Sequence, residues 1–308
     1  MSVAKIVVIG SLNMDLIIQA PYFPAPGETV IGGMFHTAAG GKGANQAVAA
    51  ARLGGRVFMV GRVGMDAYGE DLLTGLAHDG VDISWVTRDE SAHTGIALIV
   101  VDDRGQNSIV VSSGANWRLS PSDVDRAVQV IRDADLVVMQ LEIPLETVTH
   151  AVALAARYQV PVLLNPAPAR ALSEEVLCNL QYLVLNENEA QLLTGISVGD
   201  VKSARDAARI LRDLGVPVVV VTLGERGAYV LASHVDTHVP AFSVHAVDTT
   251  AAGDAFVGAF AVAIAQNMPL EEAVRFGAAA GALAATKIGA QPSLPTLPDV
   301  ERLLKSAL

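Results

Sequence analysis

The sequence has few of the residues that hold proteins together by covalent or aromatic contacts. Its 308 residues include one cysteine, Cys178, and aromatic residues make up 5% of the chain. A single cysteine excludes disulfides within the chain and fits a reducing compartment. No apolar run approaches the ~20 residues needed to span a bilayer, since the run over 255–265 is too short. The first residues lead directly into a strand, so we expect no signal peptide and a cytoplasmic protein.

Basic residues are also scarce, with 21 Lys and Arg against 32 Asp and Glu and a net charge of −11. This balance argues against a nucleic-acid surface, and we expect neither nucleic acid nor membrane as a partner. The chain is instead 51% hydrophobic, mostly Ala, Val and Leu. That composition is typical of an α/β protein whose parallel sheet is covered on both faces.

Strand and helix patterns alternate through most of the chain. After a strand over 3–9, we expect helices over 44–53 and 68–78 and one helix over 120–131, with short apolar strands between. Repeated βα units predict a doubly wound, mostly parallel sheet with helices on both faces. Ligands of such sheets bind beyond the carboxyl ends of the strands. Polar residues follow several of these strands, namely Gln140, Glu142, Asn165, Asn186, Glu189 and Thr222.

Two strand pairs interrupt this alternation, 16–20 with 28–37 and 94–101 with 107–112. We expect them to form one small sheet that acts as a lid. The predicted core is then residues 1–12, 39–92 and 113–308, and the lid is 13–38 and 93–112. Its outer face is expected to carry Ile17, Val30, Ile99 or Val110 in some alternation. An exposed apolar face of that kind usually marks an interface, so we expect a homodimer joined through the lids.

The segment Asp248–Asp254 reads DTTAAGD and leads into a helix that is apolar on every side. Such a helix is buried, so its N-terminus is expected to point into the protein. Free N–H groups and the positive end of the helix dipole favour an anion there. The Asp254 carboxylate can accept a proton from a hydroxyl at the same place. The alternative is that Asp254 only stabilises the start of its helix.

Several other patterns have a plain structural interpretation. Gly41-Lys42-Gly43 lacks the Ser or Thr of a Walker A loop, and Gln46 stands where a dinucleotide fingerprint has its third glycine. Asn186 and Glu189 could form an ordinary helix cap. His234 and His238 have metal-like spacing, but their extended stretch indicates solvated side chains.

The chain resembles the PfkB family of carbohydrate kinases over essentially its whole length. The matching segments, in chain order, are GSLNMDL, AAGGKGANQAVAAARLG, QLEIPLE, NPAPAR, NENEAQLLTG, TLGERG, DTTAAGDAF and GAQPS. So many ordered segments at matching spacings make the resemblance specific. Within the family, GGKGANQAVAA together with Asn13 and Asp15 is similar to the ribokinase subgroup.

The resemblance implies ATP-dependent phosphorylation of D-ribose at its 5-hydroxyl, with a related sugar or nucleoside such as 2-deoxyribose as the alternative. It implies Asp254 as general base and the amides of Ala251, Ala252 and Gly253 as an anion hole. The implied sugar-binding residues are Asn13, Asp15, Gly40, Gly41, Lys42, Asn45, Glu142 and Asp254. The implied ATP-binding residues are Asn186, Thr222, Leu223, Gly224, Glu225, Arg226, Gly227, Gly253, Asp254 and Ala278.

The resemblance also implies two metal ions. Asn186 and Glu189 would position Mg²⁺ through water. K⁺ would be held, largely through backbone carbonyls, by Asp248, Thr250, Ala284, Lys287, Gly289 and Ser293. Two residues depart from the family pattern. Ala251 replaces a common glycine, which we expect to be tolerated only with φ below zero, and Ala278 replaces a polar residue near the nucleotide, so no side-chain contact is expected there.

Overall fold

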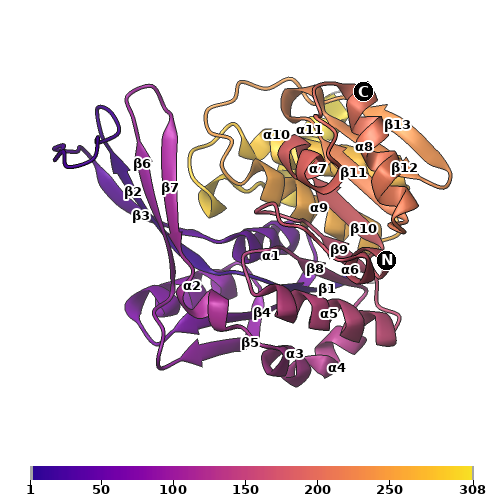
Figure 1. The fold of residues 1–308 in the computed structure, drawn as a ribbon, viewed down its shortest axis with the longest axis horizontal. Helices are drawn as coiled ribbons and strands as arrows, with labels where there is room; N and C mark the ends of the chain where they lie inside the picture. Colours follow the sequence, from indigo (N-terminus) through magenta and orange to yellow (C-terminus); the bar gives the residue numbers. More distant parts are fainter. Residues whose placement is uncertain (1–2, 307–308) are drawn as a thin grey trace.

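A computed structural model describes residues 3–306 as a large sheet between two layers of helices, with a small sheet standing off at one side (Figure 1). The large sheet has nine strands in the order β13-β12-β11-β10-β9-β8-β1-β4-β5. Pairing is parallel from β11 through to β5, and β12 and β13 are antiparallel. The predicted doubly wound, mostly parallel sheet is confirmed. Its strands are β1 Lys5–Ile9, β4 Arg56–Gly64, β5 Asp82–Asp89, β8 Leu136–Met139, β9 Val162–Leu164, β10 Tyr182–Leu185, β11 Val218–Thr222, β12 Ala228–Ala232 and β13 Val235–Val239.

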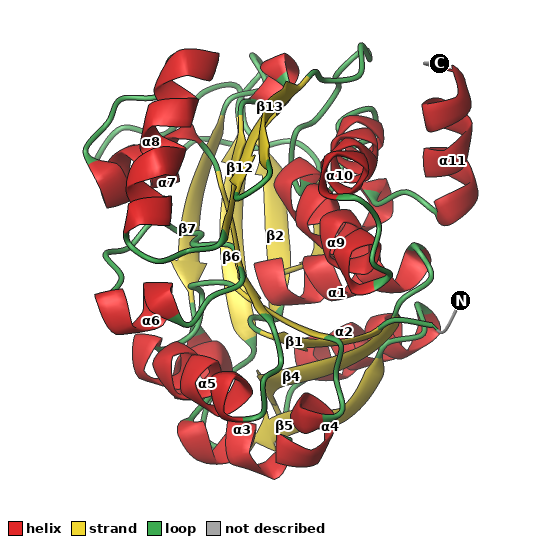
Figure 2. Cartoon of the chain, turned by 90° about the vertical axis from the view of Figure 1, so that its right-hand side faces the viewer, coloured by secondary structure: helices red, strands yellow, loops and turns green. Residues whose placement is uncertain are grey.

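Helices cover both faces of this sheet because successive strand residues point to opposite sides. In β1, Ile6 and Val8 join one buried apolar cluster, while Val7 and Ile9 join the other. Figure 2 shows α9 and α10 on one face and α5 to α8 on the other. The first cluster packs against α1 Lys42–Arg52, α2 Ala67–His78, α9 Ala252–Ala265, α10 Leu270–Ala284 and α11 Leu297–Ser306. The second packs against α3 Pro121–Arg126, α4 Val128–Arg132, α5 Leu145–Arg157, α6 Glu174–Cys178, α7 Glu187–Thr194 and α8 Val201–Asp213.

The prediction of one helix over 120–131 was wrong, because the chain divides into α3 and α4 at Ala127. Ala127 has ψ of 6°, and its amide donates to the carbonyl of Val124, three residues back. Three short 3₁₀ helices complete the elements: Gly114–Arg118, Gly224–Arg226 and Gln291–Ser293. Between residues 3 and 306 there is no helix long and apolar enough to cross a membrane.

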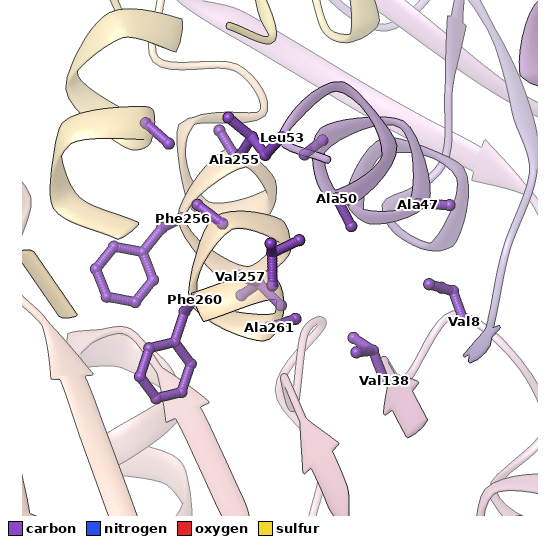
Figure 3. Packing of buried hydrophobic residues seen from close by; sticks show 14 of the residues in the cluster. Val8, Ala47, Ala50, Leu53, Val138, Ala255, Phe256, Val257, Phe260 and Ala261 are labelled. Atoms are coloured by element: carbon purple, nitrogen blue, oxygen red, sulfur yellow. The ribbon is translucent and has the colours of Figure 1, made fainter. Parts of the chain in front are cut away.

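Helix α9 is buried over most of its length, as its apolar sequence predicts. It packs against α1 along small residues, and Figure 3 shows Leu53, directly after α1, beside Ala255 of α9. Gly258 permits this closeness, since a Cβ at that position would lie 2.6 Å from the Cβ of Ala49 and 2.8 Å from the Gln46 carbonyl oxygen. The close approach brings the first turn of α1 next to the first turn of α9.

The small sheet has the strand order β3-β2-β6-β7. Its two hairpins are antiparallel, and β2 and β6 join them in parallel, so the prediction of one small sheet is confirmed. Residues 28–34, predicted as strand, form none; Gly32 and Gly33 interrupt the run, and the strand begins at Phe35. The bounds are β2 Asn13–Gln19, β3 Phe35–Gly40, β6 Gly95–Val101 and β7 Asn107–Ser112.

The register of the small sheet decides which side chains share a face. Asp15 pairs with Ala97, and Ile17 pairs with Ile99, so Ile17 and Ile99 lie on the Asp15 face. The expectation that they lie on the outer face was therefore wrong. Val110 does lie on the opposite face, where it is 65% exposed. Val30 is outside the strands altogether.

Candidate active site

The buried carboxylate of Asp254 lies where the first turns of α9 and α1 meet. Asn45 donates to its Oδ2 over 2.9 Å, and Gln46 donates to its Oδ1 over 2.9 Å. Asp254 is 5% exposed. Both donors come from the first turns of α1, and the α1–α9 packing holds them against the carboxylate. Asp254 is thus fixed by two amides rather than by a cationic partner.

Three further charged groups surround this position, one of them from the lid. Burial, followed by the nearby carboxylates of Glu142 and Asp254, raises the pKa of Asp15 to about 7. Burial opposes the charge of Lys42, but the carboxylates of Asp254 and Glu142 outweigh it and raise the pKa of the ammonium. The cluster therefore holds one ammonium ion among more acidic groups than it can neutralise. Hydroxyl donors entering the cluster would relieve that imbalance.

Glu142 and Asn13 are each fixed by a neighbouring side chain. Ser11 donates to Glu142 Oε2 over 2.6 Å, and the backbone amide of Lys42 donates to the same oxygen over 3.1 Å. The Asn116 amide nitrogen donates to Asn13 Oδ1 over 2.7 Å. The Leu12 N–H donates to Asn116 Oδ1, which sets the orientation of Asn116. Asn13 is consequently left to present its amide nitrogen as a donor.

Gly40 and Gly41, directly before α1, allow the backbone of the lid to lie close to the core. A Cβ at Gly40 would lie 2.3 Å from Asp15 Oδ2. Gly41 has a φ of +87°, and a Cβ there would lie 2.6 Å from the backbone nitrogen of Asn13. Neither position accepts a side chain. These residues therefore place Asn13 and Asp15 beside Lys42 and Asn45.

One polar atom of the cluster has no hydrogen-bond partner within residues 3–306. The Asn45 side-chain oxygen is buried and unpaired, while its nitrogen donates to Asp254. A buried acceptor without a donor is costly, by about 1–3 kcal/mol. A hydroxyl group of a ligand would supply such a donor.

The Asp15 carboxyl is expected to lower the stability of the ligand-free protein at neutral pH. With a folded-state pKa of about 7 against 3.8, the folded protein binds a proton that the unfolded chain has released. Stability therefore falls as pH rises through this window, and the penalty is full above pH 7. Asp15→Asn should raise the free energy of unfolding by roughly 1–3 kcal/mol at pH 8 and change it little near pH 4. Urea unfolding at the two pH values measures this, and equal effects at both would contradict it.

A cavity of about 800 Å³ lies on the other side of the α9 N-terminus. Its walls combine the loop after β11 with the facing sides of α9 and α10. Of the residues expected to bind ATP, this cavity is lined by Thr222, Gly224, Glu225, Arg226, Gly227, Gly253 and Ala278. Leu223 does not line it; its side chain is buried in the core, and its amide donates to the Gly227 carbonyl. Sequence reasoning missed Phe242 and Phe256, which give the cavity aromatic walls suited to a planar base.

Asn186 and Glu189 form a capping box at the start of α7, which confirms the helix-cap interpretation. Asn186 accepts from the Glu189 amide over 2.9 Å, and Glu189 accepts from the Asn186 backbone and side-chain nitrogens. Burial raises the pKa of Glu189, against the hydrogen bond from Asn186 and the attraction of Lys42. The carboxylate thus sits in the field of the Asp254–Lys42 cluster. Neither residue lines the large cavity.

The turn before α9 has strained backbone. Ala251 has a φ of +59°, so the expectation of a φ below zero was wrong. The left-handed conformation costs an alanine about 1–2 kcal/mol. The Ala252 amide donates to the Thr249 carbonyl. Of the amides at this helix end, those of Ala251, Gly253 and Asp254 have no acceptor among the described residues, so an anion would bind there.

Asp248 joins this turn to the loop after α10. Its Oδ2 accepts from the Gly289 amide over 2.9 Å, and its Oδ1 accepts from the Thr250 amide and hydroxyl. Burial opposes its charge, but these hydrogen bonds lower its pKa. Ser293 is fully buried on the second loop and donates to the Ala290 carbonyl. Between residues 3 and 306 no group of three or more His, Cys, Asp or Glu side chains is arranged to hold a metal ion.

The two histidines with metal-like spacing do not form a site. His238 lies in β13, and its Nε2 contacts the Arg226 carbonyl at 2.6 Å. The prediction of a solvated side chain was wrong for His238, which is half-buried. It was right for His234, which is exposed in the turn before β13. The contact ties β13 to the loop that lines the large cavity.

Comparison with known proteins shows the family to which this site belongs. The model of the pfkB family of carbohydrate kinases matches residues 3–297. The chain belongs to the PfkB family. It is 43% identical over 300 residues to a ribokinase from Haemophilus influenzae, covering 97% of this chain and 98% of that protein. It is 41% identical to a deoxyribokinase from Salmonella typhi, with the same coverage.

Ribokinase from Arabidopsis thaliana, solved in complex with ribose and ATP, has the same fold with a TM-score of 0.90. The two chains are 33% identical, and 99% of each is covered. The protein is therefore a kinase with the ribokinase-like fold, as its sequence motifs predicted. In this PfkB kinase, the acidic cluster and the large cavity lie on either side of the Asp254 helix terminus, which suits transfer of a phosphoryl group between them.

Proposed function

We propose that the protein transfers the γ-phosphoryl group of ATP to the 5-hydroxyl of D-ribose. The observation that carries this proposal is the position of Asp254. Its carboxylate lies in the first turn of α9, between a cluster rich in hydrogen-bonding groups and the 800 Å³ cavity. A sugar hydroxyl on one side and a triphosphate on the other would meet at this point.

The residues of the chain divide the chemistry between them. Asn13, Asp15, Lys42, Asn45 and Glu142 bind the sugar hydroxyls, as donors and acceptors. Asp254 accepts the proton of the 5-hydroxyl as that oxygen attacks the γ-phosphorus. The amides of Gly253 and Asp254, with the α9 dipole, bind the charge of the transferring group. Phosphoryl transfer needs mainly positioning and charge stabilisation, and the site offers both.

The nucleotide is assigned to the large cavity. Gly224, Glu225, Arg226 and Gly227 with Thr222 lie along one wall, and Ala278 contributes only a methyl group on α10. The base packs against Phe242 and Phe256. Mg²⁺ bound to the phosphates would neutralise part of their charge, and Asn186 and Glu189 would position it through water. The buried Glu189 carboxylate fits that role, because it lies near Asp254 and Lys42.

A K⁺ site is assigned to the two loops that Asp248 joins. The oxygens would come from Asp248 and Thr250 on one loop and from Ala284, Lys287, Gly289 and Ser293 on the other. The loops fit this role because the bond between Asp248 and the Gly289 amide already holds them together. A cation there would fix the turn that carries the Gly253 amide.

Replacing Na⁺ by K⁺ at matched ionic strength is expected to raise kcat or kcat/KM several-fold, since the cation pre-sets the amide dipoles. This gain should be smaller than the ~10²-fold fall in kcat that follows when an enzyme loses one oxyanion-hole donor. Asp248→Ala should remove most of the difference between the two salts. Steady-state rates in KCl and NaCl measure this, and equal rates for the unmodified protein would remove the K⁺ assignment.

We further propose a cytoplasmic homodimer that forms through the lids. On the face opposite Asp15, Leu98 is 51% and Val110 65% exposed, and Phe35 on β3 is 60% exposed. A contiguous apolar face of this kind is typical of an interface. Sedimentation at micromolar concentration tests the assignment, and a monomer there would contradict it.

A panel of sugars with ATP and Mg²⁺ tests the substrate. D-ribose, 2-deoxyribose, fructose 6-phosphate and adenosine are compared by ADP release. D-ribose should give the highest kcat/KM. The second candidate substrate is 2-deoxyribose, favoured by the 41% identity to a deoxyribokinase. No ADP release with any pentose would contradict the proposed function.

A further inference from the structure

We propose that Gln46 is a positioning residue for the general base, holding the Asp254 carboxylate through a relay of buried amides. The role of Asp254 as base rests on the proposed function. Gln46 itself is expected to contact neither sugar nor nucleotide. It acts only through the carboxylate that it holds.

The relay joins the ends of three adjacent strands to α1 and α9. Gln140, directly after β8, donates to Gln46 Oε1 over 2.6 Å. Gln46 Nε2 donates both to Asp254 Oδ1 over 2.9 Å and to Asn165 Oδ1 over 3.1 Å. Asn165, directly after β9, donates to the Val184 carbonyl in β10 over 3.0 Å. Gln46 and Gln140 are fully buried, and Asn165 is 9% exposed.

The Val184 carbonyl fixes the orientation of this relay. A carbonyl oxygen can only accept, so the Asn165 group facing it must be the NH₂. Asn165 Oδ1 then faces Gln46, which must turn its own NH₂ toward both Asn165 and Asp254. In this orientation Gln140 donates to the Gln46 oxygen, while its own Oε1 has no partner among the described residues. A backbone group in the large sheet thereby determines that Asp254 receives a donor on Oδ1.

Asn45, the other partner of Asp254, differs from Gln46 in one respect. Its Oδ1 is buried without a partner in the described part of the chain, so its side chain is free to bind an entering hydroxyl. Both hydrogens of the Gln46 NH₂ are already used. Gln46 is consequently the donor that remains on the carboxylate while Asn45 exchanges partners. It keeps Oδ2 directed at the attacking hydroxyl.

Gln46→Met keeps the length of the side chain and removes both donors. We expect kcat to fall by about 10- to 100-fold, because small misplacements of a reacting group cost rates of this order. The KM for ribose should change little. Thr147→Val is the matched control, since Thr147 is buried and donates to the Leu119 carbonyl over 2.7 Å, and neither residue has a role in the proposed site. This control should keep kcat within about twofold of the unmodified protein.

Gln46→Glu supplies a readout that a merely structural role would not change. A second carboxyl beside Asp254 would share a proton with it and raise the pKa of the pair. The acidic limb of the kcat–pH profile should then move upward by about one unit or more. The other charged groups of the cluster around Asp254, namely Asp15, Lys42, Glu142 and Glu189, are the same in both proteins. This variant also decides the question if Gln46→Met does not fold.

A folded Gln46→Met protein with kcat within about threefold of the unmodified protein would overturn the proposal. So would a Gln46→Glu profile with an unmoved acidic limb. Asp254→Asn separates this failure from failure of the proposed function. If Asp254→Asn abolishes turnover while Gln46→Met does not, only the positioning role is wrong. If Asp254→Asn is itself active, the role of Asp254 as base is wrong.

Discussion

Asp254→Asn is expected to lower kcat by ~10²- to 10⁴-fold, the range that a general base contributes. Asparagine has the same shape as aspartate, and its oxygen can still accept from Asn45 or Gln46, whose donors lie at 2.9 Å. The fold and the affinity for both substrates should therefore remain. The variant lacks only the group that takes the proton of the sugar hydroxyl.

Steady-state rates together with calorimetric binding of ribose and of an ATP analogue separate these effects. Asp200→Asn is a suitable control, because Asp200 caps α8 by accepting from the Ser203 amide and has no role in the proposed site. Asparagine caps helices about as well as aspartate, so that control should be fully active. Turnover of Asp254→Asn within about tenfold of the unmodified protein would show that Asp254 is not the base.

D-ribose is expected to exceed 2-deoxyribose in kcat/KM by a large factor. A site built to bond a hydroxyl leaves polar groups unpaired when the hydroxyl is missing, at a loss of up to ~10⁴-fold. Asp15 is an acceptor that burial, together with the nearby carboxylates of Glu142 and Asp254, makes costly without a donor. The unpaired oxygen of Asn45 adds to this cost. Removing one sugar hydroxyl should leave at least one of these groups without its partner.

The ratio of the two kcat/KM values, taken at one pH near 8, measures this discrimination. Asp15→Asn should reduce both this ratio and the activity on ribose. The reason is that an asparagine oxygen accepts hydrogen bonds from sugar hydroxyls less strongly than an aspartate carboxylate. Equal values for both sugars in the unmodified protein would favour the 2-deoxyribose alternative. They would leave the kinase assignment intact, since family membership does not depend on the sugar.

Much of the fold could be predicted because it depends on local pattern. Short apolar runs alternating with helical segments determine the parallel sheet, and the wholly apolar α9 could only be a buried helix. The faces of the lid strands were harder to predict. Ile17 shares the Asp15 face because the two residues alternate within β2, a pattern that the sequence already contained. The face of Ile99 depends instead on the pairing of β6 with β2, which are far apart in the sequence.

The active site, like the fold, could be predicted from the sequence only in part. Asp15, Lys42 with Asn45, and Asp254 come together from three segments that are far apart in the sequence. Gln46 was passed over, since only the α1–α9 packing shows that it contacts Asp254. A signal existed: Gln46 is an amide in a helix that otherwise consists mainly of small apolar residues on its buried face. The positive φ of Ala251 could not be predicted, because the turn geometry is set by Asp248 and the facing loop.

The most direct test of the account is the position of the phosphate in the product. The purified protein is incubated with D-ribose, ATP and Mg²⁺, and the product is examined by ³¹P and ¹H NMR. The site between the sugar cluster and the α9 terminus predicts ADP and ribose 5-phosphate in equal amounts, with the phosphorus coupled to the two C5 protons. A phosphate on any other carbon, or ADP released without a phosphorylated sugar, would contradict the proposed arrangement of the active site.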